Sequence, residues 1–378
     1  MLEEEIKILK KMFGGQVYSY PLKSYENQSY FRTLETKLHL FEDKISQLPD
    51  NSDFFKRIKG QREELQLLNR RLTNSISNYL WGSQRGASSH FKLLIESPFV
   101  TKKLLRLSEA LGNVPEGKSD RLFRLRISAS ELIEREDLFH IPFTKRHLVA
   151  NHRFSIAGLP CLYLGSSIYV CWLEIQKPNF SNIYISGYRT TESLRVINLA
   201  YTLDSIINDL EHGDLEINRF IEKFLLWPLI MACSFQTKYP KAPFHEEYII
   251  PGLLLEWITY SSQEISGLKY LSTKLNSSSK KKYGFNYVIP PQNLRDHYEY
   301  CPALSKKFIL TNPLPWQLLT ILPPADVVAL GSGIKAENIE DALLDNYEFS
   351  RFGFVEEQVF SMKFDTVKKP KQLTHGRS

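Results

Sequence analysis

Residues 138–175 read LFHIPFTKRHLVANHRFSIAGLPCLYLGSSIYVCWLEI and are the most informative part of this sequence. Ala157-Gly158-Leu159-Pro160 contains two strong turn formers, so we expect a turn there. The mostly apolar run 160–164 that follows is typical of a short β-strand. Because side chains alternate across a strand, Tyr163 is predicted to face away from its two leucine neighbours.

A helix is predicted directly after this strand. Gly165-Ser166-Ser167 interrupts the β-run and offers a serine hydroxyl as the helix N-cap. One face of the expected helix is apolar and consists of Ile168, Cys171, Trp172 and Ile175. Glu174 flanks that face, so we expect its carboxylate to lie at the edge of the core. A carboxylate held in this way is a better catalytic candidate than one on the open surface.

Outward from this stretch, the sequence predicts an α+β domain over residues 120–320. Short runs of β-favouring residues recur at 122–127, 160–164, 182–186, 194–199 and 307–310. Helical patterns lie between them, notably at 216–235 and in GLLLEWI after Pro251. A polar stretch rich in turn formers, residues 112–118, separates this domain from the preceding part of the chain.

Residues 1–115 are predicted to form a separate helical domain. Apolar residues recur at steps of three and four on both sides of a break at 49–52. They are Phe31, Leu34, Leu38, Phe41, Ile45 and Leu48, then Ile58, Leu65, Leu68, Leu72, Ile76 and Tyr79. Packing within a bundle is expected of such faces, and a homo-oligomerising or partner-binding face is the alternative. Residues 321–378 form a C-terminal extension with a predicted strand (326–330), a predicted helix (337–346) and a basic tail.

Composition narrows the class of protein. The 378 residues are 43% hydrophobic and 24% charged, which excludes low-complexity and wholly disordered chains. The sequence shows neither a membrane-spanning apolar run nor a signal-peptide pattern, so we expect a cytoplasmic protein. Four cysteines without a C-x-x-C pair argue against a disulfide framework and a cysteine-rich metal site, and no metal is expected. The net charge of +6 is too mild to indicate dedicated nucleic-acid recognition.

Two further patterns carry less information. Gly331-Ser332-Gly333-Ile334-Lys335-Ala336 fits G-x-G-x-x-A, but too few residues follow it for a dinucleotide-binding fold, so a strand-to-helix turn is expected. Two R-x4-H pairs, Arg85/His90 and Arg135/His140, match the catalytic motif of helical HEPN ribonucleases. The ribonuclease therefore stays an alternative.

Arg153, Tyr163 and Glu174 follow one another at separations of 10 and 11 positions, across the turn, the L-Y strand, the small-residue cap and the helix. Further along, Gly267-Leu268-Lys269-Tyr270-Leu271-Ser272 fits the pattern G-[IL]-x-Y-x-S. Together these motifs resemble the RES domain, a family named after its arginine, glutamate and serine residues. Many relatives have proline before that serine, where this chain has leucine. The resemblance covers residues 120–320 and not the N-terminal helices.

The resemblance implies a fold similar to that of mono-ADP-ribosyltransferase toxins, with NAD+ bound as a substrate between two small sheets. It implies an enzyme that cleaves the nicotinamide–ribose bond, as a NAD+ glycohydrolase or phosphorylase. It further implies a bacterial toxin or defence effector, neutralised by an antitoxin protein. One alternative is mono-ADP-ribosylation of a protein. Another is a non-enzymatic interaction protein with a degenerate RES site.

The chemistry of this reaction suits the residues. Cleavage develops positive charge on the ribose while nicotinamide leaves as a neutral molecule, so the protein must stabilise a cation. Glu174 is the expected catalytic carboxylate beside the anomeric carbon. The resemblance places Arg153 at the diphosphate, Tyr163 at the nicotinamide, and Ser272 at a phosphate or at the nicotinamide amide. Arg146 is a secondary candidate for binding the substrate.

Overall fold

The computed structural model describes residues 2–112, 121–260, 264–275, 283–292, 298–319 and 346–368. The chain forms two compact units. The helical unit comprises Met1–Ser108, Asn151–Ser155 and Ile197–Ser261, and the sheet unit comprises Glu109–Ala150, Ile156–Val196 and Ser262–Ser378. Each unit buries its own set of apolar side chains.

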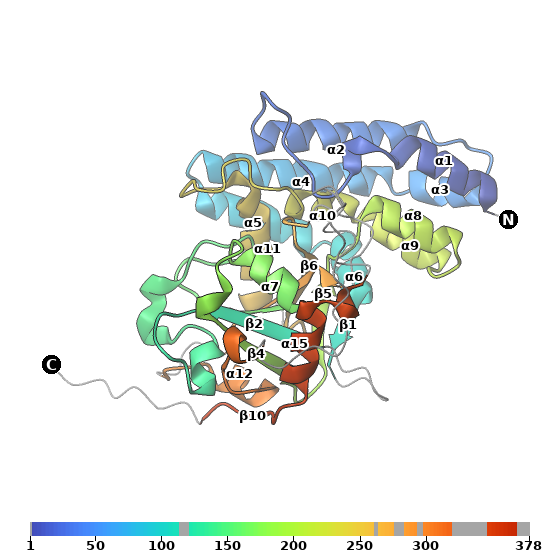
Figure 1. Ribbon diagram of the computed structural model, residues 1–378. Helices are drawn as coiled ribbons and strands as arrows, with labels where there is room; N and C mark the ends of the chain where they lie inside the picture. Colours follow the sequence, from blue (N-terminus) through green and yellow to red (C-terminus); the bar gives the residue numbers. More distant parts are fainter. Residues whose placement is uncertain are drawn as a thin grey trace. The chain divides into compact units, whose positions relative to one another are not determined.

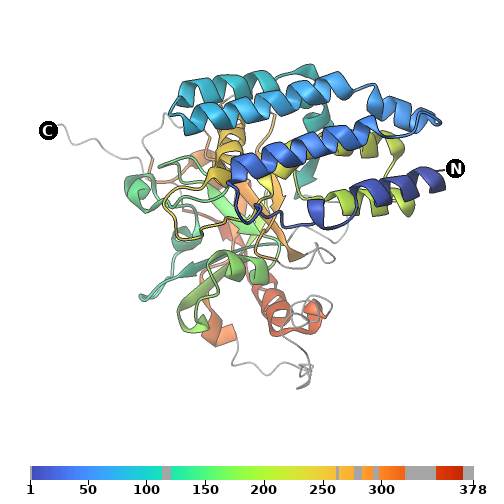
Figure 2. The same ribbon diagram turned by 90° about the horizontal axis from the view of Figure 1, so that it is seen from above.

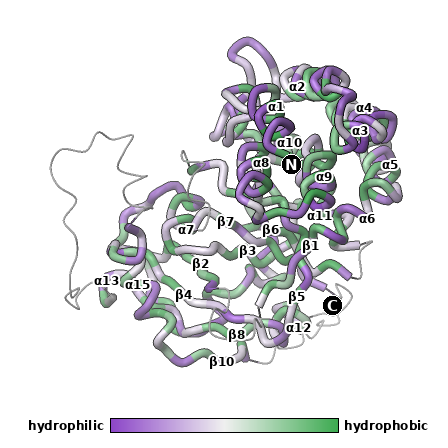
Figure 3. The backbone as a smooth tube through the Cα atoms, turned by 90° about the vertical axis from the view of Figure 1, so that its right-hand side faces the viewer, coloured by the Kyte–Doolittle hydropathy of each residue, from purple (hydrophilic) through white to green (hydrophobic). Residues whose placement is uncertain are grey.

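The helical unit consists mainly of α-helices (Figures 1 and 2). Its helices are α1 (Glu3–Phe13), α2 (Tyr30–Ser46), α3 (Asp53–Lys59), α4 (Arg62–Leu80), α5 (Gln84–Ile95), α6 (Pro98–Leu107), α8 (Leu203–Glu211), α9 (Ile217–Leu225), α10 (Trp227–Cys233) and α11 (Ile249–Tyr260). Helix α4 packs against α2, α5 and α11. Helices α10 and α11 are mostly buried and apolar, which places them in the interior of this unit (Figure 3).

The two apolar faces predicted near the N-terminus pack inside the helical unit. Leu34, Leu38, Phe41 and Ile45 are buried on α2, and Leu65, Leu68, Leu72 and Ile76 are buried on α4. The predicted break at 49–52 separates α2 from α3, and the Ser52 hydroxyl caps α3 by accepting from the Phe55 N–H. These faces are therefore used for bundle packing, as expected.

The sheet unit is built on one twisted sheet with short helices. Its elements include β1 (Ser108–Leu111), β2 (Leu122–Ile127), β3 (Leu162–Gly165), α7 (Ile168–Glu174), β4 (Ile183–Thr190), β5 (Leu194–Asn198), β6 (Gly267–Leu271), β7 (Phe285–Ile289), α12 (Pro302–Lys307), β8 (Phe308–Leu310), β9 (Leu314–Pro315), α13 (Trp316–Leu319), α15 (Arg351–Phe360) and β10 (Asp365–Thr366). Within the described residues the strand order is β1-β5-β6-β7-β3-β2-β4-β8-β10, with β9 paired to β4. The short 3-10 helices are Gln16–Tyr18 and Glu246–Tyr248 in the helical unit, and Arg135–Leu138, Phe143–Leu148, Phe180–Asn182 and Tyr347–Phe349 in the sheet unit.

The two faces of the central strands bury different clusters. In the antiparallel pairing of β3 with β7, Tyr163 lies opposite Val288 and Gly165 lies opposite Asn286. One face packs against α7 and α15, in a cluster that includes Phe123, Ile168, Ile185 and Val359. The other face carries a cluster that includes Leu122, Leu164, Tyr188, Tyr287 and Leu304. Helix α7 contacts β2, β3 and β7, so its position relative to the sheet is fixed by three strands.

The predicted α+β class is confirmed, and several short strands lie close to the runs that predicted them. Residues 122–127 form β2, and the runs 160–164, 182–186, 194–199 and 307–310 correspond to β3, β4, β5 and β8. The helical pattern 216–235 is divided into α9 and α10, because Pro228 starts a new helix. The two small sheets implied by the RES resemblance are not confirmed. Since β2 pairs with both β3 and β4, the described strands join in one sheet.

The units do not follow the segment boundaries expected from the sequence. Residues 197–261 were expected in the 120–320 domain, but they belong to the helical unit, where α8 contacts α1 and α9 contacts α6. The predicted strand 326–330, almost all of the predicted helix 337–346 and the glycine motif at 331–336 lie outside the described residues. Among the helices of the described ranges, none combines the length and apolar character needed to cross a membrane.

Candidate functional site

The start of α7 is anchored to the sheet by two serines. The Ser167 hydroxyl caps the helix by accepting from the Val170 N–H at 3.0 Å, as the sequence predicts, and donates to the main-chain oxygen of Tyr283 at 2.6 Å. Ser166 exchanges two hydrogen bonds with Phe285 at the start of β7, one from each N–H. The turn between β3 and α7 is therefore tied to the strand beside it.

Glycine at position 165 allows α7 to approach β3 closely. A Cβ atom at Gly165 would lie 2.5 Å from the Cys171 sulfur and 2.7 Å from a methyl carbon of Val170. Any side chain there would push the helix away from the sheet. The close contact helps to fix where α7 ends, and the last residue of that helix is Glu174.

The Glu174 carboxylate is held by two donors on one oxygen. The Ser272 hydroxyl donates to Glu174 Oε1 at 2.6 Å, and Asn286 Nδ2 donates to the same oxygen at 2.7 Å. The Ser272 oxygen also accepts from the Lys274 N–H at 3.3 Å, which directs its own proton toward Glu174. Ser272 is fully buried and Asn286 is nearly so. Two such donors fix the orientation of the carboxylate and stabilise its negative charge.

The second carboxylate oxygen, Oε2, lies beside a lysine. Lys274 Nζ donates to the main-chain oxygen of Glu174 at 2.8 Å and lies 3.4 Å from Glu174 Oε2. The exposed fractions of the two side chains are 36% for Glu174 and 40% for Lys274, so a ligand can reach both. A cation beside the carbonyl groups of a helix C-terminus is favourable. Within the described ranges, no cluster of three or more His, Cys, Asp or Glu side chains is able to hold a metal ion.

Two tyrosines share the sheet face that carries Asn286. Tyr270 lies directly opposite Asn286 in the pairing of β6 with β7. Tyr163 lies opposite Val288, two residues from Asn286 along β7, so its side chain points to the same face. Burial raises the pKa of Tyr163 well above its ordinary value, with Cys161 and Tyr270 as neighbouring groups, so the phenol stays protonated. Tyr163 is therefore near Asn286 on the face covered by α7.

The two predicted arginines have different surroundings. Arg153 belongs to the helical unit, where it is 8% exposed, donates to the main-chain oxygen of Cys233 at 3.0 Å and lies over the Tyr248 ring. Arg146 belongs to the sheet unit, donates to the main-chain oxygen of Gly158 at 2.8 Å and lies over the Phe143 ring. Their contact with a diphosphate stays a prediction.

The second R-x4-H pair makes structural contacts. His140 Nε2 accepts from the Cys301 N–H at 2.8 Å, so the ring proton resides on Nδ1, which is 2.8 Å from the Ile141 carbonyl oxygen. Burial lowers the pKa of His140 to about 4, and Arg135 donates through Nε to the main-chain oxygen of Leu310. A histidine that is neutral and bonded on both ring nitrogens is poorly suited to acid–base catalysis near neutral pH. The first pair, Arg85 and His90, lies on α5.

The structure thus brings Glu174 and Ser272 together and places Tyr163 on the neighbouring sheet face. Sequence reasoning missed Asn286, Lys274 and the location of Tyr270. Asn286 carried a usable signal, because it is an amide inside the otherwise apolar strand FNYVI. Lys274 carried none, since a lysine three residues after a strand is ordinary.

Comparison with known proteins gives one informative match. No family model matches the chain, and no solved structure matches it. A curated protein of Bacillus subtilis (strain 168) named "Putative toxin YopC" is 37% identical over 206 residues, which cover 52% of this chain and 46% of that protein. The chain therefore spans about half the length of the relative that it matches. The similarity is to a toxin-named protein, and the RES resemblance rests on the motifs quoted above.

Proposed function

We propose that this chain is a toxin enzyme of RES type that consumes NAD+ by cleaving its nicotinamide–ribose bond. The observation that carries the proposal is the partly exposed Glu174 carboxylate, with one oxygen held by Ser272 and Asn286 and the other beside Lys274. The name of the Bacillus subtilis relative supports the toxin role. That name also supports an antitoxin protein as the partner of this chain.

Glu174 supplies negative charge at a fixed place. When the bond between ribose C1′ and the nicotinamide nitrogen breaks, both electrons leave with neutral nicotinamide and positive charge develops on the sugar. A carboxylate beside C1′ stabilises that charge, and its accessible oxygen accepts a hydrogen bond from a ribose hydroxyl. Water or phosphate then bonds to C1′. With water, the products are ADP-ribose, nicotinamide and one proton.

The neighbouring residues orient this carboxylate and bind the rest of the substrate. Ser272 and Asn286 prevent Glu174 from rotating, because both donate to Oε1. This differs from the role that the resemblance suggests for Ser272, since its hydroxyl proton is directed to Glu174 and not to the substrate. Lys274 is a cation that a diphosphate group would attract, and Tyr163 offers an aromatic face for nicotinamide. Arg153 and Arg146 stay proposed diphosphate ligands.

The test is release of nicotinamide from NAD+ by the purified chain. We expect the wild type to release it and Glu174→Gln, which keeps the shape but removes the charge, to be slower by about 10²–10³-fold. Glu131→Gln is the matched control, because Glu131 is an exposed carboxylate of the sheet unit, and it should match the wild type. No release, or equal release by wild type and Glu174→Gln, would refute the proposal and favour the non-enzymatic interaction protein.

A second measurement identifies the acceptor. NAD+ labelled in its adenine yields labelled ADP-ribose if water is the acceptor, and the 1″-phosphorylated form if phosphate is. Label attached to protein would instead support mono-ADP-ribosylation. Expression of wild type and Glu174→Gln in a bacterial host tests the toxin role, since only the wild type should arrest growth.

A further inference from the structure

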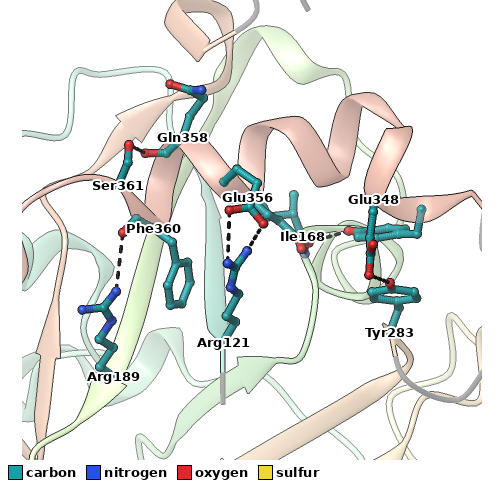
Figure 4. Close-up of polar contacts among 11 residues, drawn as sticks. Arg121, Ile168, Arg189, Tyr283, Glu348, Glu356, Gln358, Phe360 and Ser361 are labelled. Carbon is teal, nitrogen blue, oxygen red and sulfur yellow. Dashed lines mark hydrogen bonds and ion pairs between the residues drawn. The ribbon is translucent and has the colours of Figure 1, made fainter. Parts of the chain in front are cut away.

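The N-terminal end of α7 receives a buried carboxylate from the C-terminal part of the chain. Glu356 lies on α15 (Figure 4), which packs against α7 within the sheet unit. Its side chain is buried, with an exposed fraction of 6%. Its Oε1 accepts a hydrogen bond from the Ile168 N–H at 2.6 Å. Ile168 is the first residue of α7, and its N–H has no partner within the helix. Glu356 therefore satisfies a donor that would otherwise be buried without an acceptor.

Tyr347 serves the next N–H of the same helix. Its hydroxyl donates to Glu356 Oε1 and accepts from the Tyr169 N–H, which lies 3.3 Å away. Val170, the third residue, donates to the Ser167 hydroxyl. The first three N–H groups of α7 thus each have a side-chain acceptor, and two of these come from residues 347–356.

Tyr347 also shares a buried cluster with the segment that carries Ser272. Its ring stacks on Tyr283 with 4.1 Å between the ring centroids, and it forms a buried cluster with Tyr169, Leu173 and Leu275. Leu275 follows Ser272 by three residues, while Leu173 precedes Glu174 directly. Tyr347 therefore belongs to a buried cluster that includes residues of both segments whose polar ends meet at the candidate site.

We propose that residues 346–360 position the candidate site, with Tyr347 and Glu356 as positioning residues that hold α7 and the Ser272–Leu275 segment together. The catalytic meaning of this inference rests on the proposed function, whereas its structural part does not. The sequence predicted a functional domain ending at residue 320, so this role for the C-terminal extension goes beyond that expectation. Neither residue touches the Glu174 carboxylate in any described contact, and both act through α7.

The protonation state of Glu356 determines which variants are informative. Burial raises the pKa of Glu356 to about 8, while the Tyr347 hydroxyl, the Ile168 N–H and Arg121 oppose that shift. The other charged or titratable groups that face it are Glu357 on its own helix and Cys171 on α7. Near pH 7 the Glu356 carboxyl is therefore mostly protonated. Glutamine resembles that form, because it keeps one acceptor oxygen and places a donor on the other side.

The experiment measures hydrogen exchange at the start of α7 together with nicotinamide release. In Glu356→Leu, which removes the acceptor, we expect the Ile168 and Tyr169 amides to exchange about tenfold faster or more, at pH 7. We expect kcat to fall by about tenfold with KM changed less than about twofold, because orientation and not binding is lost. Glu356→Gln should restore both properties to within about threefold of the wild type.

The controls separate positioning from folding and from the proposed activity. Glu357→Gln, at an exposed neighbour paired with Arg121, should leave exchange and kcat unchanged. If Glu356→Leu does not fold, Tyr347→Phe decides, since it keeps the ring and removes only the hydroxyl; faster exchange at Tyr169 supports the proposal. Wild-type exchange at the start of α7 in a folded Glu356→Leu or in Tyr347→Phe overturns it. If the wild type releases no nicotinamide, the proposed function fails while the exchange data still decide the positioning.

Discussion

The two ends of α7 meet the rest of the sheet unit in different ways. At the N-terminal end, the Ile168 and Tyr169 N–H groups donate to buried side chains from the C-terminal part of the chain. At the C-terminal end, the Glu174 carboxylate has donors on one oxygen and an accessible lysine beside the other. Only the second end can exchange contacts with a ligand. At the first end, buried side-chain acceptors hold the helix in place.

This difference shows how a short helix can present a charge precisely enough for chemistry. A seven-residue helix is too short to be stable by itself, so its position depends on tertiary contacts. Buried, fully paired polar groups supply a unique orientation at one end. The partly exposed carboxylate at the other end then keeps its freedom to bind while its direction stays fixed.

After the loss of the Glu174 charge itself, the largest effect is expected at the exposed end, from removing both donors to its carboxylate. Ser272→Ala and Asn286→Ala should each lower kcat for nicotinamide release by about tenfold, and the double variant by about 10²-fold. Each single variant leaves one donor on Oε1, so the carboxylate keeps part of its orientation. Steady-state kinetics on the purified variants measure this.

Ser361→Ala is the matched control for those variants, because the Ser361 hydroxyl bonds only locally to the Gln358 carbonyl in the contacts described, on the exposed end of α15 (Figure 4). It should retain wild-type kcat. A double variant within about threefold of the wild type would mean that orientation of Glu174 does not matter, and the contrast between the two ends would lose its functional meaning.

The strand, turn and helix leading to Glu174 could be predicted because their signals are local. Gly165, the Ser167 cap and the apolar face of α7 act within about ten residues of one another. Asn286 could not be placed at the site in the same way, since it meets Glu174 from 112 positions away. Only the register of β3 with β7 brings that amide to the right face, and a one-residue slip would turn it to the other side.

The larger grouping of the chain was hard to predict for a related reason. Helices α8 and α9 follow β5 in sequence, and their order along the chain suggests one domain. Their apolar residues, such as Ile207 and Phe220, are buried within the helical unit instead. Amphipathic periodicity shows that a helix has a face to bury, but not which partner will cover it. The same limit applies to Arg153, which the sequence places in the 120–320 domain, whereas residues 151–155 belong to the helical unit.

A smaller effect is expected between the two ends of α7, where the middle of the helix contacts the sheet. Gly165→Ala should lower the free energy of unfolding by about 1–3 kcal/mol, because the new Cβ would meet Cys171 and Val170 at less than 3 Å. Urea denaturation measures the change. Gly252→Ala in α11 is the control, where the added Cβ would lie 3.4 Å from the Ser155 carbonyl oxygen and helix propensity improves. Equal stability of Gly165→Ala and wild type would show that α7 does not depend on this close approach.

The last expected effect is the change in stability per pH unit, at the buried end of α7. Glu356 has an ordinary pKa of 4.5, and burial raises it to about 8 in the folded protein. Between these values the unfolded chain has lost the proton that the folded protein keeps, so this group's contribution to the free energy of unfolding falls as pH rises. The slope is at most about 1.4 kcal/mol per pH unit, and the contribution is fully lost once the pH passes the folded pKa.

Glu356→Gln replaces the titrating carboxyl with an amide, so the contribution of this group to the pH dependence of the unfolding free energy disappears. The difference in unfolding free energy, variant minus wild type, should rise by about 1 kcal/mol per pH unit from about pH 5 to 8 and then level off. Taking the difference cancels the opposite contribution of His140, whose pKa is lowered to about 4 by burial. Urea titrations at several pH values give both curves. A flat difference would mean that Glu356 is ionised in the folded protein near neutral pH. The N-terminal end of α7 would then be capped by a charged carboxylate and not by a neutral carboxyl group.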